Sequence, residues 1–177
     1  QKLETVNFNE KLETIGAAAF SGCTRLTGDL VIPESVTSIG NSAFSGCTGL
    51  DGKLTIEGNA ESTTIGSSAF YDCNKITALE LGDGITIIGN GAFSDCSGMK
   101  GDLIIPDTVT SIGNSAFQYC SKLTTLILRN STVCALSSTN TFSYTPFDSG
   151  KAGGKLLVPR DLVESYKTAT NWSVIWG

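Results

Sequence analysis

Six cysteines are the residues of this chain best suited to chemistry, since thiols bind zinc, form disulfides and act as nucleophiles. The chain contains no histidine, which removes the usual general base and the Ser-His and Cys-His pairs of hydrolases. Zinc sites need pairs of ligands close together in the sequence, and even the closest two cysteines, Cys120 and Cys134, are too far apart for such a pair. No P-loop, dinucleotide or calcium-loop motif is present. We therefore predict no metal, no cofactor and no enzymatic activity.

Five of the six cysteines recur at one position of a repeated motif, Ile-Gly-x-x-Ala-Phe-x-x-Cys. The copies begin at nearly equal intervals, at Ile15, Ile39, Ile65, Ile88 and Ile112. Side chains at equivalent positions of stacked repeats point in the same direction, and parallel Cβ vectors suit a disulfide poorly. We expect these thiols to be buried and outside any disulfide. Cys134 lies outside the motif and is the one candidate for an exposed or reactive thiol, although we expect a buried structural role for it. A hydrolase using Cys134 is the weakest functional hypothesis.

A short alternating segment follows each motif and predicts a strand: DLVIP, KLTIE, ALELG, DLIIP and TLILR. Segments around Val6 to Phe8 and Leu156 to Val158 add two more strands. A period near 24 with this apolar pattern is typical of leucine-rich repeats, in which each unit adds one parallel strand to a solenoid. The predicted fold class is therefore α/β, a horseshoe-like leucine-rich repeat solenoid. We expect a parallel sheet of about seven short strands, with short helical or 3-10 turns.

One domain, residues 1–177, accounts for the whole pattern. It divides into a partial repeat (1–14), five repeats (15–128), a degenerate repeat with an irregular, mobile loop (129–154), and a last strand with a C-terminal helical cap (155–177). The repeated phenylalanines and cysteines form the predicted structural core: Phe20, Phe44, Phe70, Phe93, Phe117, Cys23, Cys47, Cys73, Cys96 and Cys120. The glycine after each motif isoleucine indicates either a positive φ or close approach between coils.

The pattern is broken at the third repeat and at both ends. The insertion EGNAEST places Ser62 where other repeats have Leu12 or Val36, which predicts a local bulge. Asp161 to Glu164 reads as a capping box for a helix through about Ala169, which would lie across the last coil as a lid. Its predicted inner face is Leu162, Tyr166 and Ala169, and Trp172 and Trp176 are assigned to cap packing. The amino end shows no such lid, so we expect an upstream coil, and a leader or other preceding region, before Gln1.

The candidate binding surface is the outward row of the predicted sheet, because residues between two inward positions of a strand point outward. This row is Asn7, Val31, Thr55, Glu80, Ile104, Ile127 and Leu157. Its last three members form an apolar strip, which is either an interaction site or a surface covered by the irregular loop or simply tolerated. Tyr71 and Tyr119 are a second surface candidate.

The net charge of −5, from 12 Lys and Arg against 17 Asp and Glu, excludes several partners. We take the acidic balance to be spread evenly along the chain, without a basic stripe to neutralise phosphates. No nucleic-acid partner is therefore expected. No apolar run is long enough to span a bilayer, so direct membrane insertion is not expected either.

The repeat resembles that of BspA-like (Treponema-type) leucine-rich repeat surface proteins. The resemblance covers essentially the whole chain, and it is strongest in the runs SVTSIG from Ser35 and TVTSIG from Thr108 and at Pro33 and Pro106. It implies a bacterial protein at the cell surface or outside the cell that acts in adhesion. The implied partner is a host or neighbouring-cell protein or glycan. The alternative is a structural spacer with no ligand of its own.

Overall fold

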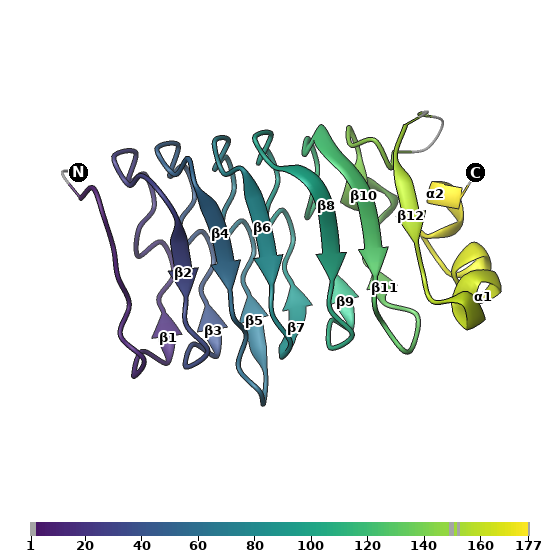
Figure 1. The fold of residues 1–177 in the computed structure, drawn as a ribbon, viewed down its shortest axis with the longest axis horizontal. Coiled ribbons are helices and arrows are strands. Elements are labelled where there is room, and N and C mark those ends of the chain that lie inside the picture. The colour runs from purple at the N-terminus through teal and green to yellow at the C-terminus, as the bar shows by residue number, and fades with distance from the viewer. Residues whose placement is uncertain (1–2, 149–150, 152, 177) are drawn as a thin grey trace.

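The computed structural model describes residues 3–148, 151 and 153–176, and it shows a stack of flattened coils. Each coil places one strand on each of two opposite faces (Figure 1). The front face carries β2 (Leu30–Ile32), β4 (Lys53–Ile56), β6 (Ala78–Leu81), β8 (Lys100–Ile105), β10 (Lys122–Leu128) and β12 (Lys155–Leu157). The back face carries β1 (Thr14–Ile15), β3 (Ser38–Ile39), β5 (Thr63–Ile65), β7 (Ile85–Ile88), β9 (Ser111–Ile112) and β11 (Ala135–Leu136).

All strand pairs are parallel and join neighbouring coils. The front strands form two three-stranded sheets, β2-β4-β6 and β8-β10-β12, and the back strands form one six-stranded sheet. Like residues pair with like, as in Leu30 with Leu54 and Ile32 with Ile56. The parallel solenoid is confirmed, but the front face has six assigned strands rather than seven, because the segment around Val6 to Phe8 is not a strand. The back sheet was not predicted.

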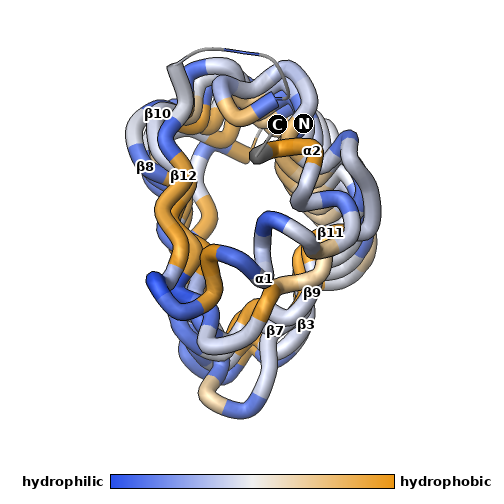
Figure 2. Tube along the Cα trace, turned by 90° about the vertical axis from the view of Figure 1, so that its right-hand side faces the viewer, coloured by the Kyte–Doolittle hydropathy of each residue, from blue (hydrophilic) through white to orange (hydrophobic). Residues whose placement is uncertain are grey.

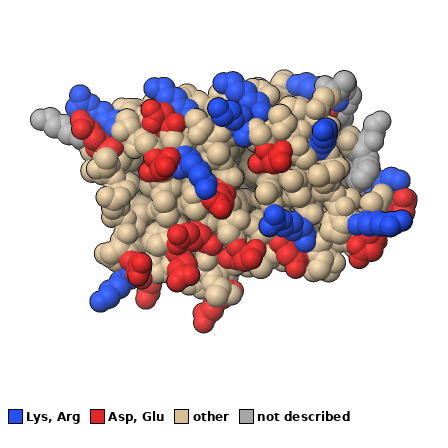
Figure 3. Space-filling view, in the orientation of Figure 1, with Lys and Arg blue, Asp and Glu red and all other residues tan. Residues whose placement is uncertain are grey.

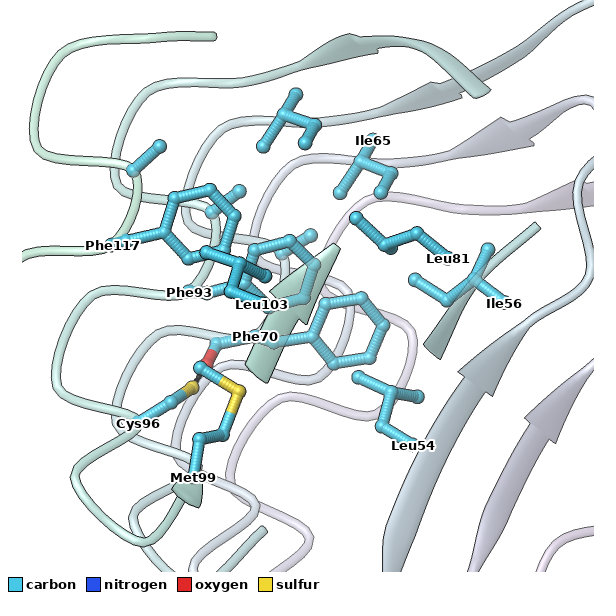
Figure 4. Close-up of a cluster of buried hydrophobic side chains, with 14 of the residues drawn as sticks. Leu54, Ile56, Ile65, Phe70, Leu81, Phe93, Cys96, Met99, Leu103 and Phe117 are labelled. Atoms are coloured by element: carbon cyan, nitrogen blue, oxygen red, sulfur yellow. Dashed lines mark hydrogen bonds between the residues drawn. The ribbon is translucent and has the colours of Figure 1, made fainter. Parts of the chain in front are cut away.

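Figure 2 shows the stacked coils end-on, coloured by hydropathy. Two side-chain columns run through the interior. Six phenylalanine rings stack with centroids 4.9 to 5.6 Å apart and planes within 12° of parallel: Phe20, Phe44, Phe70, Phe93, Phe117 and Phe142. Beside them, the thiol of each cysteine from Cys47 to Cys120 donates to the phenylalanine carbonyl of the preceding coil, at 3.1 to 3.2 Å. Figure 4 shows Cys96 and Met99 next to the central rings. The same residue therefore recurs because each coil must match its neighbour.

The Ala-Phe segments are isolated hydrogen-bonded turns held to the next coil. The amide of Phe93 donates to the carbonyl of Ala116 at 2.8 Å, and the amide of Cys96 closes a turn on Phe93 at 3.2 Å. Only the sixth coil contains a 3-10 helix here, η1 (Thr139–Phe142), among the residues that the structure describes. The expected short helical or 3-10 turns are thus mostly single turns, because every second amide bonds across coils instead of along the chain.

The glycine after each motif isoleucine allows close backbone approach, and none of these five has a positive φ. A Cβ atom at Gly89 would lie 2.7 Å from the carbonyl carbon of Gly66 and from the nitrogen of Ser67. At Gly16, in the first repeat, the same atom would meet nothing within 4 Å. Of the two alternatives drawn from the sequence, close approach is confirmed.

The third repeat contains the expected bulge, but a different residue fills the inward position. The pairing of β5 with β7 shifts register between Thr63 and Thr64. Thr63 lies opposite Ile85 and is fully buried, whereas Ser62 is half-buried. The Thr63 hydroxyl donates to the carbonyl of Val36 at 2.9 Å, which satisfies a polar group inside an apolar core.

A helical cap covers the last coil. It consists of η2 (Arg160–Leu162), α1 (Val163–Thr168) and α2 (Ser173–Trp176). Tyr166 and Trp172 are fully buried, and the indole of Trp172 donates to the carbonyl of Cys134 at 2.6 Å. The predicted capping box is wrong, because α1 begins after Leu162 and no side chain caps it. The side chain of Trp176 lies outside the described residues.

The coil at the other end has a less complete core. Ala19 is exposed and Phe20 is only partly buried, although both belong to the predicted inward set. Phe8 contacts the ring of Phe20 edge-on, with centroids 5.7 Å apart. None of the described helices has the length and apolar character needed to cross a membrane.

Candidate interaction surfaces

The cysteines are placed for packing. All six are buried and none forms a disulfide. Cys134, the candidate reactive thiol, is only 1% exposed, and its amide and carbonyl bond to Tyr166 and Trp172 of the cap. Burial raises the pKa of the Cys134 thiol to about 12 and the pKa of Cys120 well above its ordinary value. The buried structural role expected for Cys134 is therefore confirmed, and a hydrolase using this residue has no accessible nucleophile.

We predict that a thiol-reactive aromatic disulfide reagent at pH 8 will modify native protein slowly and unfolded protein at all six cysteines. The folded core excludes the reagent from all six thiols, and the raised pKa values of Cys120 and Cys134 also keep these two protonated. Absorbance of the released thiolate, with and without denaturant, gives both rates. Rapid modification of five or six thiols in native protein would contradict this packing.

The predicted outward row lies on the front face. Val31, Thr55 and Glu80 are register partners on β2, β4 and β6. Ile104, Ile127 and Leu157 are register partners on β8, β10 and β12 and form the apolar strip. Leu157 is 52% exposed, and Ile104 and Ile127 are partly exposed. Asn7 is also exposed, but in a segment outside the sheet.

The described residues that follow β11 do not cover the apolar strip. Residues 137–148 follow the path of a sixth coil, with Phe142 stacked on Phe117 at 5.6 Å. Thr141 is fully buried and replaces the motif alanine, since its carbonyl accepts from the amide of Phe117. This part of the degenerate unit is thus a regular coil whose motif has been lost, while residues 149, 150 and 152 lie outside the described residues.

The two predicted surface tyrosines are both exposed, but they lie apart. Tyr71 occupies a position held by serine in the neighbouring coils, with its carbonyl bonded to Gly46. Tyr119 has a φ of 64° and stacks on Tyr144, whose φ is 60°, with centroids 4.5 Å apart. The ammonium of Lys151 lies 5.5 Å from the centroid of the Tyr144 ring. Sequence reasoning missed Tyr144, although it follows Tyr119 by one repeat length.

Charge is distributed unevenly along the chain, contrary to the expectation from composition. Residues 1–99 contain five Lys and Arg against twelve Asp and Glu, whereas residues 100–177 contain seven against five. In the space-filling view, acidic groups gather over the lower ends of β2, β4 and β6 (Figure 3). Lys53 and Glu80 form an ion pair on this half of the front face. The apolar strip lies in the other half, which is the more basic one.

The strands of the back face carry no charge. Six windows of described residues, one per coil, contain no Lys, Arg, Asp or Glu: 14–22, 35–50, 62–71, 84–94, 108–121 and 130–147. Asp72 and Asp95 lie in the turns that follow β5 and β7, and charged residues also lie on the front face, at its edges and at the two ends of the stack. One exposed aliphatic residue stands on the back sheet, Ile87 at 45% exposure. Recognition that depends on charge must therefore use the front face and its edges.

Comparison with known proteins identifies others that share this repeat. A sequence model of the BspA type leucine rich repeat region matches residues 1–124, in six copies. The chain belongs to this family. The Treponema pallidum leucine-rich repeat protein is 27% identical with a TM-score of 0.62, over 72% of this chain and 60% of that protein. A leucine-rich cell surface protein of Faecalibacterium prausnitzii is 18% identical with a TM-score of 0.61, over 98% of this chain and 51% of that one.

The BspA-type chain thus spans 60% of the first solved neighbour and about half of the second. A search of curated proteins gave no match. The family repeat and the stacked coils support a role in protein interaction or in structure.

Proposed function

We propose that this BspA-type solenoid is a non-enzymatic adhesion module, displayed at a bacterial cell surface, that binds a protein of a host or neighbouring cell through its front face. The observation that carries the proposal is the partly exposed apolar strip of Ile104, Ile127 and Leu157 on three neighbouring strands. Aliphatic side chains in register on an open sheet provide the desolvated centre that protein interfaces require, and the charged rim around them provides specificity.

The interior of the solenoid favours surface binding over binding in a pocket. Phenylalanine, cysteine and aliphatic columns fill the space between the front and back faces. An apolar hollow of about 300 Å³ lies at the amino-terminal end of the stack, lined by Phe8, Leu12, Ile15 and Phe20 among others. It is an end of the core rather than a site with converging polar groups, so the faces offer the larger recognition surface.

The location at the cell surface is supported by the family and by the cell surface protein among the solved neighbours. A glycan is a second candidate ligand class, favoured by the exposed tyrosines Tyr119 and Tyr144. A structural spacer with no ligand is the alternative function, and a stack of matched coils would serve it equally well.

An Ile127→Glu variant tests the proposal against the spacer alternative. We expect the wild-type chain to bind at least one immobilised extracellular-matrix protein, and the variant to bind it at least about tenfold more weakly, because a buried carboxylate would stand at the centre of the interface. Surface plasmon resonance measures both dissociation constants. Asn114→Glu, an exposed position in the turn that follows β9, is the matched control and should bind like the wild type.

Two outcomes would count against the proposal. Equal binding by the wild type and Ile127→Glu would reject the front face as the site. Absence of binding by the wild type to the full matrix panel and to intact host cells would favour the spacer.

A further inference from the structure

Two rows of side chains cross β8, β10 and β12 on the front face. The first is the apolar strip of Ile104, Ile127 and Leu157. The second is a basic row at the amino ends of the same strands, formed by Lys100, Lys122 and Lys155. Lys100 and Lys122 are register partners, whereas Lys155 lies opposite Thr125, nearer to the apolar strip along the strands, and all three lysines are exposed. The apolar strip runs along the axis of the solenoid, one residue per strand, and the basic row crosses the same strands obliquely.

The spacing of these rows suits a helix better than an extended segment. Neighbouring strands are about 4.8 Å apart, and one turn of an α-helix rises about 5.4 Å. A helix lying along the solenoid axis therefore presents one apolar side chain to each of the three strands, with a mismatch of only about 1 Å across them. Alternate residues of an extended strand are roughly 6.6 Å apart, so their side chains would not line up with strands about 4.8 Å apart.

The charges around the apolar strip determine which sign of charge the flank of such a helix must carry. Beyond the carboxyl ends of β10 and β12, Arg129 and Arg160 are also exposed. Asp161, also exposed, follows Arg160 in η2. The carboxylates next to β8 and β10 are Asp102, which accepts from the Thr124 hydroxyl at 3.4 Å, and Asp107, whose side chain accepts from the amide of Ser131. Both carboxylates bond to their own neighbours, whereas the three lysines of the basic row are exposed, and Figure 3 shows basic groups along the upper edge of this face.

We propose that the front face of residues 100–157 binds an amphipathic α-helix of a partner protein, with an apolar seam on the strip and an acidic flank on the basic row. The inference rests on the proposed function, and it specifies the secondary structure and charge of the bound partner. The other half of the front face belongs to residues 1–99, which carry twelve Asp and Glu against five Lys and Arg; this acidic surplus repels the same flank and fixes where along the solenoid the helix binds.

A pair of synthetic helical peptides tests this inference directly. Each has leucines at i, i+3, i+4 and i+7 over three heptads, and they differ only in one flank, glutamate in one and lysine in the other. We expect the glutamate peptide to bind the wild-type chain at least about tenfold more tightly than the lysine peptide at low salt, measured by fluorescence anisotropy. Lys122→Glu should reverse the preference, and Lys75→Glu, an exposed lysine on the acidic half, should leave it unchanged.

Equal affinity for the two peptides, no binding of either, or a preference that survives Lys122→Glu would overturn the inference. Circular dichroism establishes that each variant is folded. The proposed function fails differently: if Ile127→Glu abolishes binding of a matrix protein while Lys122→Glu does not, the face is still the binding site and only the acidic helix is wrong. Weakened binding in both variants supports both statements.

Discussion

Replacing Phe93 with alanine is expected to lower the free energy of unfolding by about 3–5 kcal/mol. The ring is fully buried and stacks between Phe70 at 5.4 Å and Phe117 at 5.3 Å, so its loss leaves a cavity bordered by two coils that cannot close independently. Each coil is stable only through its neighbours, which makes a central break costly to the whole stack. Urea denaturation monitored by circular dichroism measures the change.

Phe20→Ala is the matched control for that variant. The residue occupies the same motif position but is only partly buried, with one stacked neighbour on one side and the edge of Phe8 on the other. Its loss should cost clearly less than the loss of Phe93. Equal destabilisation by the two substitutions would contradict the claim that burial and stacking on both sides make Phe93 more important than Phe20.

Gly89→Ala is expected to destabilise the protein by roughly 1–3 kcal/mol, although alanine is among the smallest possible changes. The added methyl would lie 2.7 Å from backbone atoms of Gly66 and Ser67 and 2.8 Å from the carbonyl oxygen of Ile65. Backbone cannot rotate away as a flexible side chain does, so the two coils must separate. Thermal and urea unfolding of the variant measure the effect.

Gly16→Ala provides the control at the same motif position in the first repeat. A Cβ atom there meets nothing within 4 Å, and the φ of Gly16 is not positive, so the change should stay within about 0.5 kcal/mol. If both glycine variants lost the same stability, the glycines would be needed for local backbone conformation rather than for contact between coils.

The periodic part of the structure could be predicted because stacking makes sequence identity a structural requirement. A phenylalanine that packs against its own copy one coil away must recur at the repeat length, so Phe44, Phe70 and Phe93 were recognisable from spacing alone. The outward positions followed in the same way from alternation along β4, β8 and β10. Alternation also located the apolar strip.

Features without a repeated residue could not be predicted. Four of the six back strands are only two residues long, which is too short for alternation to be recognised, and their pairing depends on the stack itself. Phe142 and Tyr144 continue two columns although the motif around them is lost, because the preceding coils of matching geometry position the next one. The N-terminus of α1 depends on the turn at Pro159 to Leu162 rather than on the side chain of Asp161.

The uneven distribution of charge could be counted from the sequence. Its consequence for binding became clear only when the structure showed the front and back faces of the solenoid. Charged residues avoid the windows that contain the back strands, so the folded chain has one neutral sheet and one charged face. The apolar strip and the basic row come together because β8, β10 and β12 are neighbours in the sheet. That juxtaposition limits the candidate binding surface to part of one face.

The most direct test of the stacked-coil structure is the hydrogen bond from the amide of Phe93 to the carbonyl of Ala116, which lies one coil later in the chain. Long-range NMR experiments detect scalar coupling between an amide nitrogen and the carbonyl carbon that accepts its hydrogen bond. The structure predicts a coupling from the nitrogen of Phe93 to the carbonyl carbon of Ala116, with equivalent couplings from Phe44 to Ala69 and from Phe70 to Ala92. Coupling of the Phe93 nitrogen to the carbonyl of Gly89 would instead indicate a local helix and contradict the account.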